Sequence, residues 1–381
     1  MKTVKTILKL IGGMLVGMVA GLLISSVGIV IFTDSTFSDF FSNFASVGLG
    51  EGVLAVLFGI VSLAVSVPLL IMLHEAGHLV CGMLSGYSFV SFRVFNFTII
   101  RREGRLRVKR FAVAGTGGQC LLSPPDEPLS QIPTALYNMG GVLANVLALL
   151  VVLPFFGCDL SPYVAEFMVI FVLTDVILIL MNGVPMCING IGNDAWNMRL
   201  LRRSMLSKRG MLIQLSSNAL IQAGIRPKDM PDEWFAAPEV IDYRNALEVA
   251  LPLMQASRML DMEHYHEAYA AFVRLYAHRA DMLGIYVNEV ACELAYCAMV
   301  TGRCDEARQL LDDASLDRYI STGRSFMSSK ERLQCARELY LNNDRPTAEA
   351  IYHRLAERRG SYLLQGEVSS DLVLMRRMLG F

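Results

Sequence analysis

The chain has 381 residues, of which 54% are hydrophobic and only 18% are charged. Soluble globular domains contain roughly 45–50% apolar and about 25% charged residues, so this composition excludes most soluble proteins. The formal net charge of −1 indicates no particular partner, because it averages an apolar first half and a charged second half.

The apolar residues are concentrated in four segments. Residues 10–32, 53–73 and 135–158 contain no Asp, Glu, Lys or Arg, and residues 167–193 contain only Asp175. Each segment has the roughly 20 residues that a helix needs to cross a membrane. We predict four membrane-spanning helices, at about 10–32, 53–82, 135–157 and 163–183.

The charges between these segments predict their orientation. Lysines precede the first segment, and clusters of Arg and Lys follow the second and the fourth. The stretches after the first and third segments contain acidic residues and no base. Since Lys and Arg accumulate in cytoplasmic loops, we expect an integral protein of a bacterial cell membrane with both termini in the cytoplasm.

Residues 87–118 show the alternation of a β-hairpin. Phe97 and Ile99 alternate with polar residues, and Leu106 and Val108 alternate with basic residues after a turn near Gly104. We predict a hairpin associated with the membrane. Its edge could hold an extended substrate segment, or its basic face could contact lipid headgroups.

The second apolar segment ends in His74-Glu75-Ala76-Gly77-His78. Residues four apart share one face of a helix, so both imidazoles can bind one metal ion. Glu75 can act as the base for a water molecule at that ion. Ionisable residues at membrane depth are costly and by default mark a functional site.

A catalytic zinc site has three protein ligands, and His74 and His78 are the only histidines in the first 263 residues. The third ligand is therefore expected to be a carboxylate or, less favourably, a thiolate. Asp175 lies within the fourth segment, and Asp194 follows it. Residues 182–192 are rich in Asn and Gly, and such a break in a helix could hold Asp194 beside the histidines.

At these residues the chain resembles the site-2 protease family of intramembrane zinc metalloproteases. The motifs that carry the resemblance are HEAGH at 74–78, Gly-x-x-x-Asn at 141–145, and Asn-x-x-Pro at 182–185 followed by Asp194. The chain departs from the family pattern at Val142, where proline is frequent, and at Ala195, where glycine is usual. Its spacing from Asn182 to Asp194 is also longer.

The resemblance implies that His74, His78 and Asp194 bind Zn²⁺. It further implies that Glu75 activates the attacking water and that Asn145 lies near the site, in contact with substrate or the oxyanion. An interhelical hydrogen bond is an equally good interpretation of Asn145.

The second half of the chain has a different character. Residues 201–241 contain three prolines and are predicted to be a linker, and residues 242–381 show amphipathic helical patterns. Three similar segments place Ala268, Ala307 and Ala348 at spacings of 39 and 41 residues. They resemble degenerate tetratricopeptide repeats, which would dock a partner protein; a helical bundle that caps the membrane domain is the alternative.

We therefore expect a polytopic α-helical membrane protein with about four transmembrane helices, followed by an all-α, helical-repeat-like soluble domain. Residues 1–200 would form a zinc metalloprotease domain that cleaves a membrane protein or peptide in or beside its transmembrane segment, without a nucleic-acid partner. A second possibility is a membrane-anchored zincin of the HtpX type, with Glu289 or Glu293 as the third ligand. A third is a non-catalytic helical-repeat scaffold.

Overall fold

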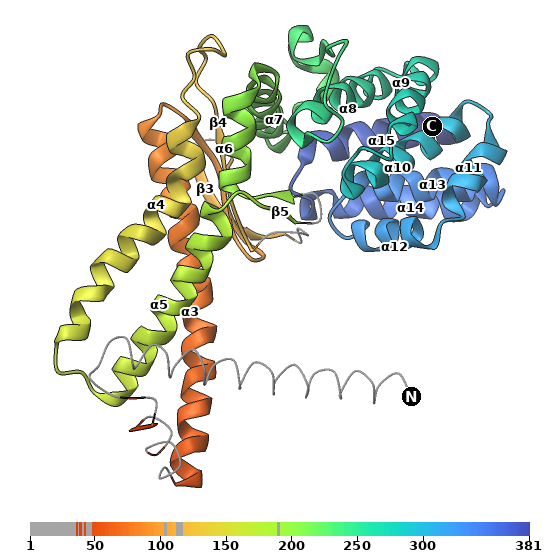
Figure 1. The fold of residues 1–381 in the computed structure, drawn as a ribbon. Coiled ribbons are helices and arrows are strands. Elements are labelled where there is room, and N and C mark those ends of the chain that lie inside the picture. The colour runs from red at the N-terminus through yellow and green to blue at the C-terminus, as the bar shows by residue number, and fades with distance from the viewer. Residues whose placement is uncertain are drawn as a thin grey trace. The chain divides into compact units, whose positions relative to one another are not determined.

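The computed structural model describes residues 36, 38, 39, 42, 48–102, 105–111, 117–188 and 191–381. Most of this part of the chain is helical, with a four-stranded antiparallel sheet and a separate two-stranded one (Figure 1). The first predicted span, at 10–32, lies outside the described residues.

Three described helices are long and apolar enough to cross a membrane. They are α3 (Leu49–Leu84), α4 (Ala135–Val152), which a 3₁₀ turn extends to Gly157, and α5 (Pro162–Gly183). Their mean hydropathies are 2.7, 2.3 and 2.5, and only 17–22% of their most apolar windows is buried. The second, third and fourth apolar segments therefore form helices of the expected length, with apolar side chains on their outer surfaces.

By its contacts the chain divides into two units. The first comprises residues up to Leu70 and Val146–Leu178, and the second comprises Ile71–Asn145 and Ile179–Phe381. Within the first unit, Phe58 of α3 meets Tyr163 of α5 edge to face, with ring centroids 5.1 Å apart.

The sheet belongs to the second unit and has four antiparallel strands. These are β1 (Ser88–Val94), β2 (Phe97–Arg102), β3 (Arg105–Arg110) and β4 (Gly118–Ser123), in the order β3-β2-β1-β4. The predicted hairpin is present as β2 and β3, where Ile99 pairs with Val108. The sheet is larger than the hairpin, because β1 also pairs with β4.

Residues 201–241 do not form a linker throughout, which corrects the expectation from their prolines. A short hairpin, β5 (Cys187–Ile188) and β6 (Ile191–Gly192), leads into α6 (Asp194–Arg203) and then α7 (Met205–Ala223). Helix α7 packs against β4, α8 and α15. Its buried side includes Ser207, Gly210 and Ser217, so the periodicity of apolar residues along this helix is weak. The three prolines all follow α7, from Pro227 onwards.

Residues 242–381 are helical, as expected. The helices are α8 (Ala246–Asp261), α9 (Tyr265–Ala277), α10 (Gly284–Val300), α11 (Cys304–Leu311), α12 (Ala314–Gly323), α13 (Ser328–Ala336), α14 (Arg345–Arg358) and α15 (Gln365–Leu379). The alanines of the three similar segments are each the fourth residue of a helix and are completely buried: Ala268 in α9, Ala307 in α11 and Ala348 in α14. This equivalence agrees with a repeat, and membership of the tetratricopeptide class stays a prediction.

Candidate metal centre

The two histidines of the HEAGH motif and Asp194 meet in the second unit. His74 and His78 lie one turn apart on α3, and Asp194 is the first residue of α6. The Nε2 atoms of the two histidines are 3.2 Å apart. Oδ2 of Asp194 lies 3.1 Å from Nε2 of His74 and 3.3 Å from Nε2 of His78. The three side chains form a group that could hold a metal ion.

The spacing of these three atoms matches the ligands of a small tetrahedral ion. Ligands about 2.0–2.1 Å from Zn²⁺ in tetrahedral geometry are about 3.3–3.4 Å from one another. The observed triangle has sides of 3.1, 3.2 and 3.3 Å. Oδ2 of Asp194 is buried and has no hydrogen-bond partner among the described residues, so this oxygen is free to bind an ion held between the two histidines.

The other nitrogen of each histidine is already engaged. Nδ1 of His74 donates to Oδ1 of Asn145, and Nδ1 of His78 donates to the backbone carbonyl of Tyr137, both at 2.7 Å. Each ring then presents an Nε2 lone pair to the triangle. Two such lone pairs and a carboxylate oxygen repel one another at this distance unless a cation or a proton lies between them.

Asn145 therefore lies behind a candidate metal ligand, His74. Its side chain is completely buried, and its hydrogen bond joins α4 to α3. This is the interhelical contact considered above, and it assigns Asn145 a role in orienting His74.

Asp194 is positioned by its neighbour, which we did not identify from the sequence. Oδ1 of Asn193 caps α6 by accepting from the backbone N–H of Trp196 at 2.9 Å. Its amide nitrogen donates to the carbonyls of Met181 and Val184 at the end of α5. Asn193 thus joins the end of one helix to the start of the next, and Asp194 takes the N-terminal position where the helix dipole favours negative charge.

Glycines leave the space that the site occupies. A Cβ atom at Gly141 would lie 2.4 Å from Nε2 of His74, so any side chain there would displace the ligand. Gly77 and Gly140 bring α3 and α4 together: a Cβ atom at Gly77 would lie 2.2 Å from the carbonyl oxygen of Gly140. Gly77, the glycine of the HEAGH motif, therefore allows α3 and α4 to pack closely.

Glu75 is also buried, with 9% of its surface exposed. It interacts electrostatically with both histidines and with Asp194. A Cβ atom at Gly118, the first residue of β4, would lie 2.5 Å from Oε1 of Glu75, so the strand begins against this carboxylate.

Arg93 is a further charged residue near Glu75 that we did not single out from the sequence. It is only 2% exposed and donates to the carbonyl of Phe95 at 2.9 Å and to that of Gly118 at 3.4 Å. Burial lowers the pKa of Arg93, while the charge of Glu75 acts in the opposite direction. Arg93 thus connects β1 to the start of β4, beside Glu75.

The alternative ligands lie elsewhere. Asp175 is buried in α5 and is not part of the group formed by the two histidines and Asp194. Burial raises the pKa of the Cys120 thiol to about 12, so this cysteine of β4 offers no thiolate near neutral pH. Glu289 and Glu293 are paired with Lys330 and Arg332 in the C-terminal helices.

Comparisons with known proteins find no matching family model, no similar curated protein and no similar solved structure. The geometry of the described residues therefore carries the functional argument.

The hydrogen bond from His74 to Asn145 makes a measurable prediction. Asn145→Ala should weaken metal binding by about 10–100-fold, as is usual when the partner that orients a histidine ligand is removed. The measurement is competition with a zinc chelator of known affinity. Asn138→Ala is the matched control, because Asn138 is buried in the same helix and donates to the carbonyl of Thr134. Equal affinities in the two variants would contradict the role of Asn145.

Proposed function

We propose that the protein is an intramembrane zinc endopeptidase that hydrolyses peptide bonds in or next to a transmembrane segment of another protein. One observation carries the proposal: the nearly equilateral triangle of His74, His78 and Asp194, with the sides given above. It lies where an apolar helix long enough to cross a membrane carries Glu75 beside the first histidine.

His74, His78 and Asp194 would hold the zinc ion. When bound, zinc polarises a peptide carbonyl and lowers the pKa of a water molecule. Glu75 accepts a proton from the attacking water and passes it to the leaving amine. Asn145 and the carbonyl of Tyr137 keep the imidazole rings in the orientation and tautomer that the ligands require.

Substrate would be held in an extended form beside β4. A helical peptide bond is protected by its own hydrogen bonds, so a transmembrane helix must unwind before it is cleaved. Within the described residues β4 is an edge strand, and its first residue, Gly118, lies against Glu75. A segment that pairs with the start of this edge would pass the carboxylate.

The β2–β3 hairpin would contact the bilayer. Its outer strand, β3, exposes Leu106 and Val108 by 63% and 68% between four basic residues. Apolar side chains among cations suit an interface of anionic headgroups.

The C-terminal helices would dock a partner or substrate protein.

The HtpX-type alternative is less favoured, because it needs Glu289 or Glu293 as a ligand. Lys330 donates to Oε2 of Glu289 at 2.7 Å, and Arg332 pairs with Glu293. A non-catalytic scaffold would not need a buried Glu75 beside two oriented imidazoles.

The test compares the membrane proteins of cells that carry the wild type or Glu75→Gln. We expect a defined set of fragments, with new ends in or beside a transmembrane segment, to be present only with the wild type. Identical fragments in both cells would reject the proposed function.

A further inference from the structure

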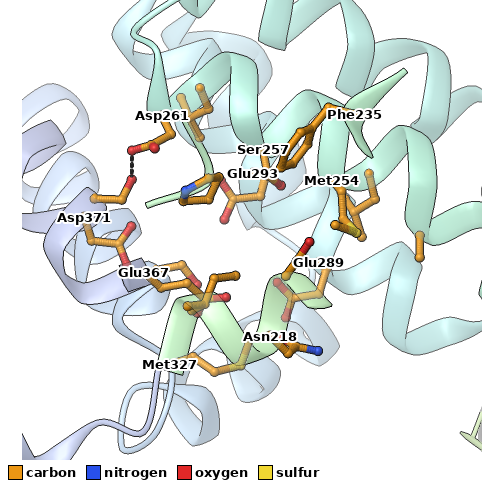
Figure 2. A pocket seen from close by; sticks show the side chains of 18 of the residues that line it. Asn218, Phe235, Met254, Ser257, Asp261, Glu289, Glu293, Met327, Glu367 and Asp371 are labelled. Atoms are coloured by element: carbon orange, nitrogen blue, oxygen red, sulfur yellow. Dashed lines mark hydrogen bonds between the residues drawn. The ribbon is translucent and has the colours of Figure 1, made fainter. Parts of the chain in front are cut away.

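A second polar centre lies between helices α7, α8, α10 and α15 of the C-terminal half. These helices surround a cavity of about 280 Å³, close to the lower limit of about 300 Å³ for small-ligand sites. Part of its wall is apolar and includes Phe235 and Met254. Figure 2 shows carboxylate side chains from several helices around the same space.

The cavity wall carries more negative than positive charge. Its five carboxylates are Asp261, Glu289, Glu293, Glu367 and Asp371. Three cations pair with four of them: Arg226 with Asp261, Lys330 with Glu289, and Arg332 with both Glu293 and Asp371. Arg332 is thus shared, and the carboxylate of Glu367 makes no ion pair or hydrogen bond among the described residues.

A buried hydroxyl in the same wall also lacks a partner. Ser217 of α7 is only 2% exposed, and its Oγ makes no hydrogen bond within the described part of the chain. Buried polar groups in native proteins are normally satisfied. An ionised carboxylate only accepts hydrogen bonds, and a hydroxyl can accept as well as donate, so a ligand that donates hydrogen bonds could satisfy both groups.

We propose that this cavity binds an organic cation, a guanidinium or primary ammonium group on a short apolar chain. The cationic group would be held by Glu367 and Asp371 of α15, with Ser217 as a further acceptor. The chain would lie against Met254 and Phe235. A cation suits this wall because a carboxylate held largely away from water is stabilised either by a proton or by an opposite charge, and the three cations nearby already pair with the other carboxylates.

Without such a ligand, Glu367 is expected to hold a proton at neutral pH. Burial, then the charges of Asp371 and Glu289, raise the pKa of Glu367 to about 8. The charged groups facing it are Asp371 on the same helix, Glu289 and Glu293 on α10, and Lys330 on α13. A bound cation favours the ionised form, so binding should release this proton and strengthen as pH rises.

The experiment measures binding to the full-length protein in detergent by calorimetry. Butylguanidinium is the probe, since its charge is constant from pH 6 to pH 9, and butylurea is its neutral counterpart of the same shape. We expect butylguanidinium to bind at least about tenfold more tightly than butylurea. Its affinity should be about tenfold higher at pH 9 than at pH 7, following the ionised fraction of Glu367.

Glu367→Gln should lower the affinity for butylguanidinium at pH 9 by about tenfold or more and remove its pH dependence. Glu357→Gln is the matched control; it removes the same charge from an exposed position on α14 and should bind as the wild type does. Equal affinities for the two probes in the wild type, or unchanged binding in Glu367→Gln, would overturn the proposal.

A second titration identifies the source of the cation. The probe is a capped Gly-Arg-Gly peptide, which carries the same group on a polypeptide. If it binds at least as well as butylguanidinium, the site takes a side chain of another protein. If only butylguanidinium binds, the site takes a free small molecule; either result supports a cation site.

Discussion

Glu75→Gln should lower the rate of peptide cleavage by the purified protein by about 10²–10⁴-fold, the usual contribution of a general acid–base residue. Glutamine keeps the size of the side chain and loses the ability to take a proton. The three proposed ligands are unchanged, so zinc content should remain that of the wild type. The measurements are cleavage of a transmembrane peptide in detergent and metal analysis of the same sample.

Glu166→Gln provides the control. Glu166 lies on α5 and is another glutamate of an apolar helix, so the substitution tests the loss of a membrane carboxylate in general. It should leave cleavage close to that of the wild type. Full activity in Glu75→Gln with zinc still present would reject the mechanism, and loss of zinc from that variant would instead make Glu75 part of the metal site.

Asp194→Ala should reduce zinc affinity by more than about 100-fold, because removing only a residue that orients a ligand already costs about 10–100-fold. The substitution takes away one corner of the donor triangle and leaves only the two imidazoles. Zinc content after dialysis against a weak chelator measures the effect, and cleavage should be lost with the metal.

Asp175→Ala tests whether Asp175, rather than Asp194, is the third metal ligand. Asp175 is completely buried, so its removal should affect stability while the purified protein retains zinc. Retention of zinc by Asp194→Ala, together with its loss from Asp175→Ala, would move the third ligand to α5.

The candidate metal site could be predicted in outline because its sequence signals are local. Helical spacing alone places His74 and His78 on one face, and a break after an apolar helix allows Asp194 to return towards them. The residues behind the ligands gave no such signal. Tyr137 acts through its backbone carbonyl, which every residue has, and Gly141 acts by the absence of a side chain.

Other features depend on tertiary packing. Helix α7 was not predicted, because its buried side carries the polar residues Ser207 and Ser217. Their burial depends on contacts with neighbouring helices, which the pattern of the segment alone does not indicate. The cavity collects Asp261, Glu293 and Glu367 from three helices, and nothing in their spacing indicates that they meet. Most helices were predictable, because hydrophobic periodicity is a property of each segment alone.

The ligand set also has a mechanical consequence. His78 and Asp194 are separated by a long stretch of chain that contains α4 and α5. An ion that joins them would act as a reversible cross-link, comparable to a disulfide, and closing a loop of about 100 residues removes about 4.7 kcal/mol of chain entropy from the unfolded state. The same three side chains would then tie catalytic competence to the integrity of the fold, so that a polypeptide without its ion would be both inactive and easier to unfold.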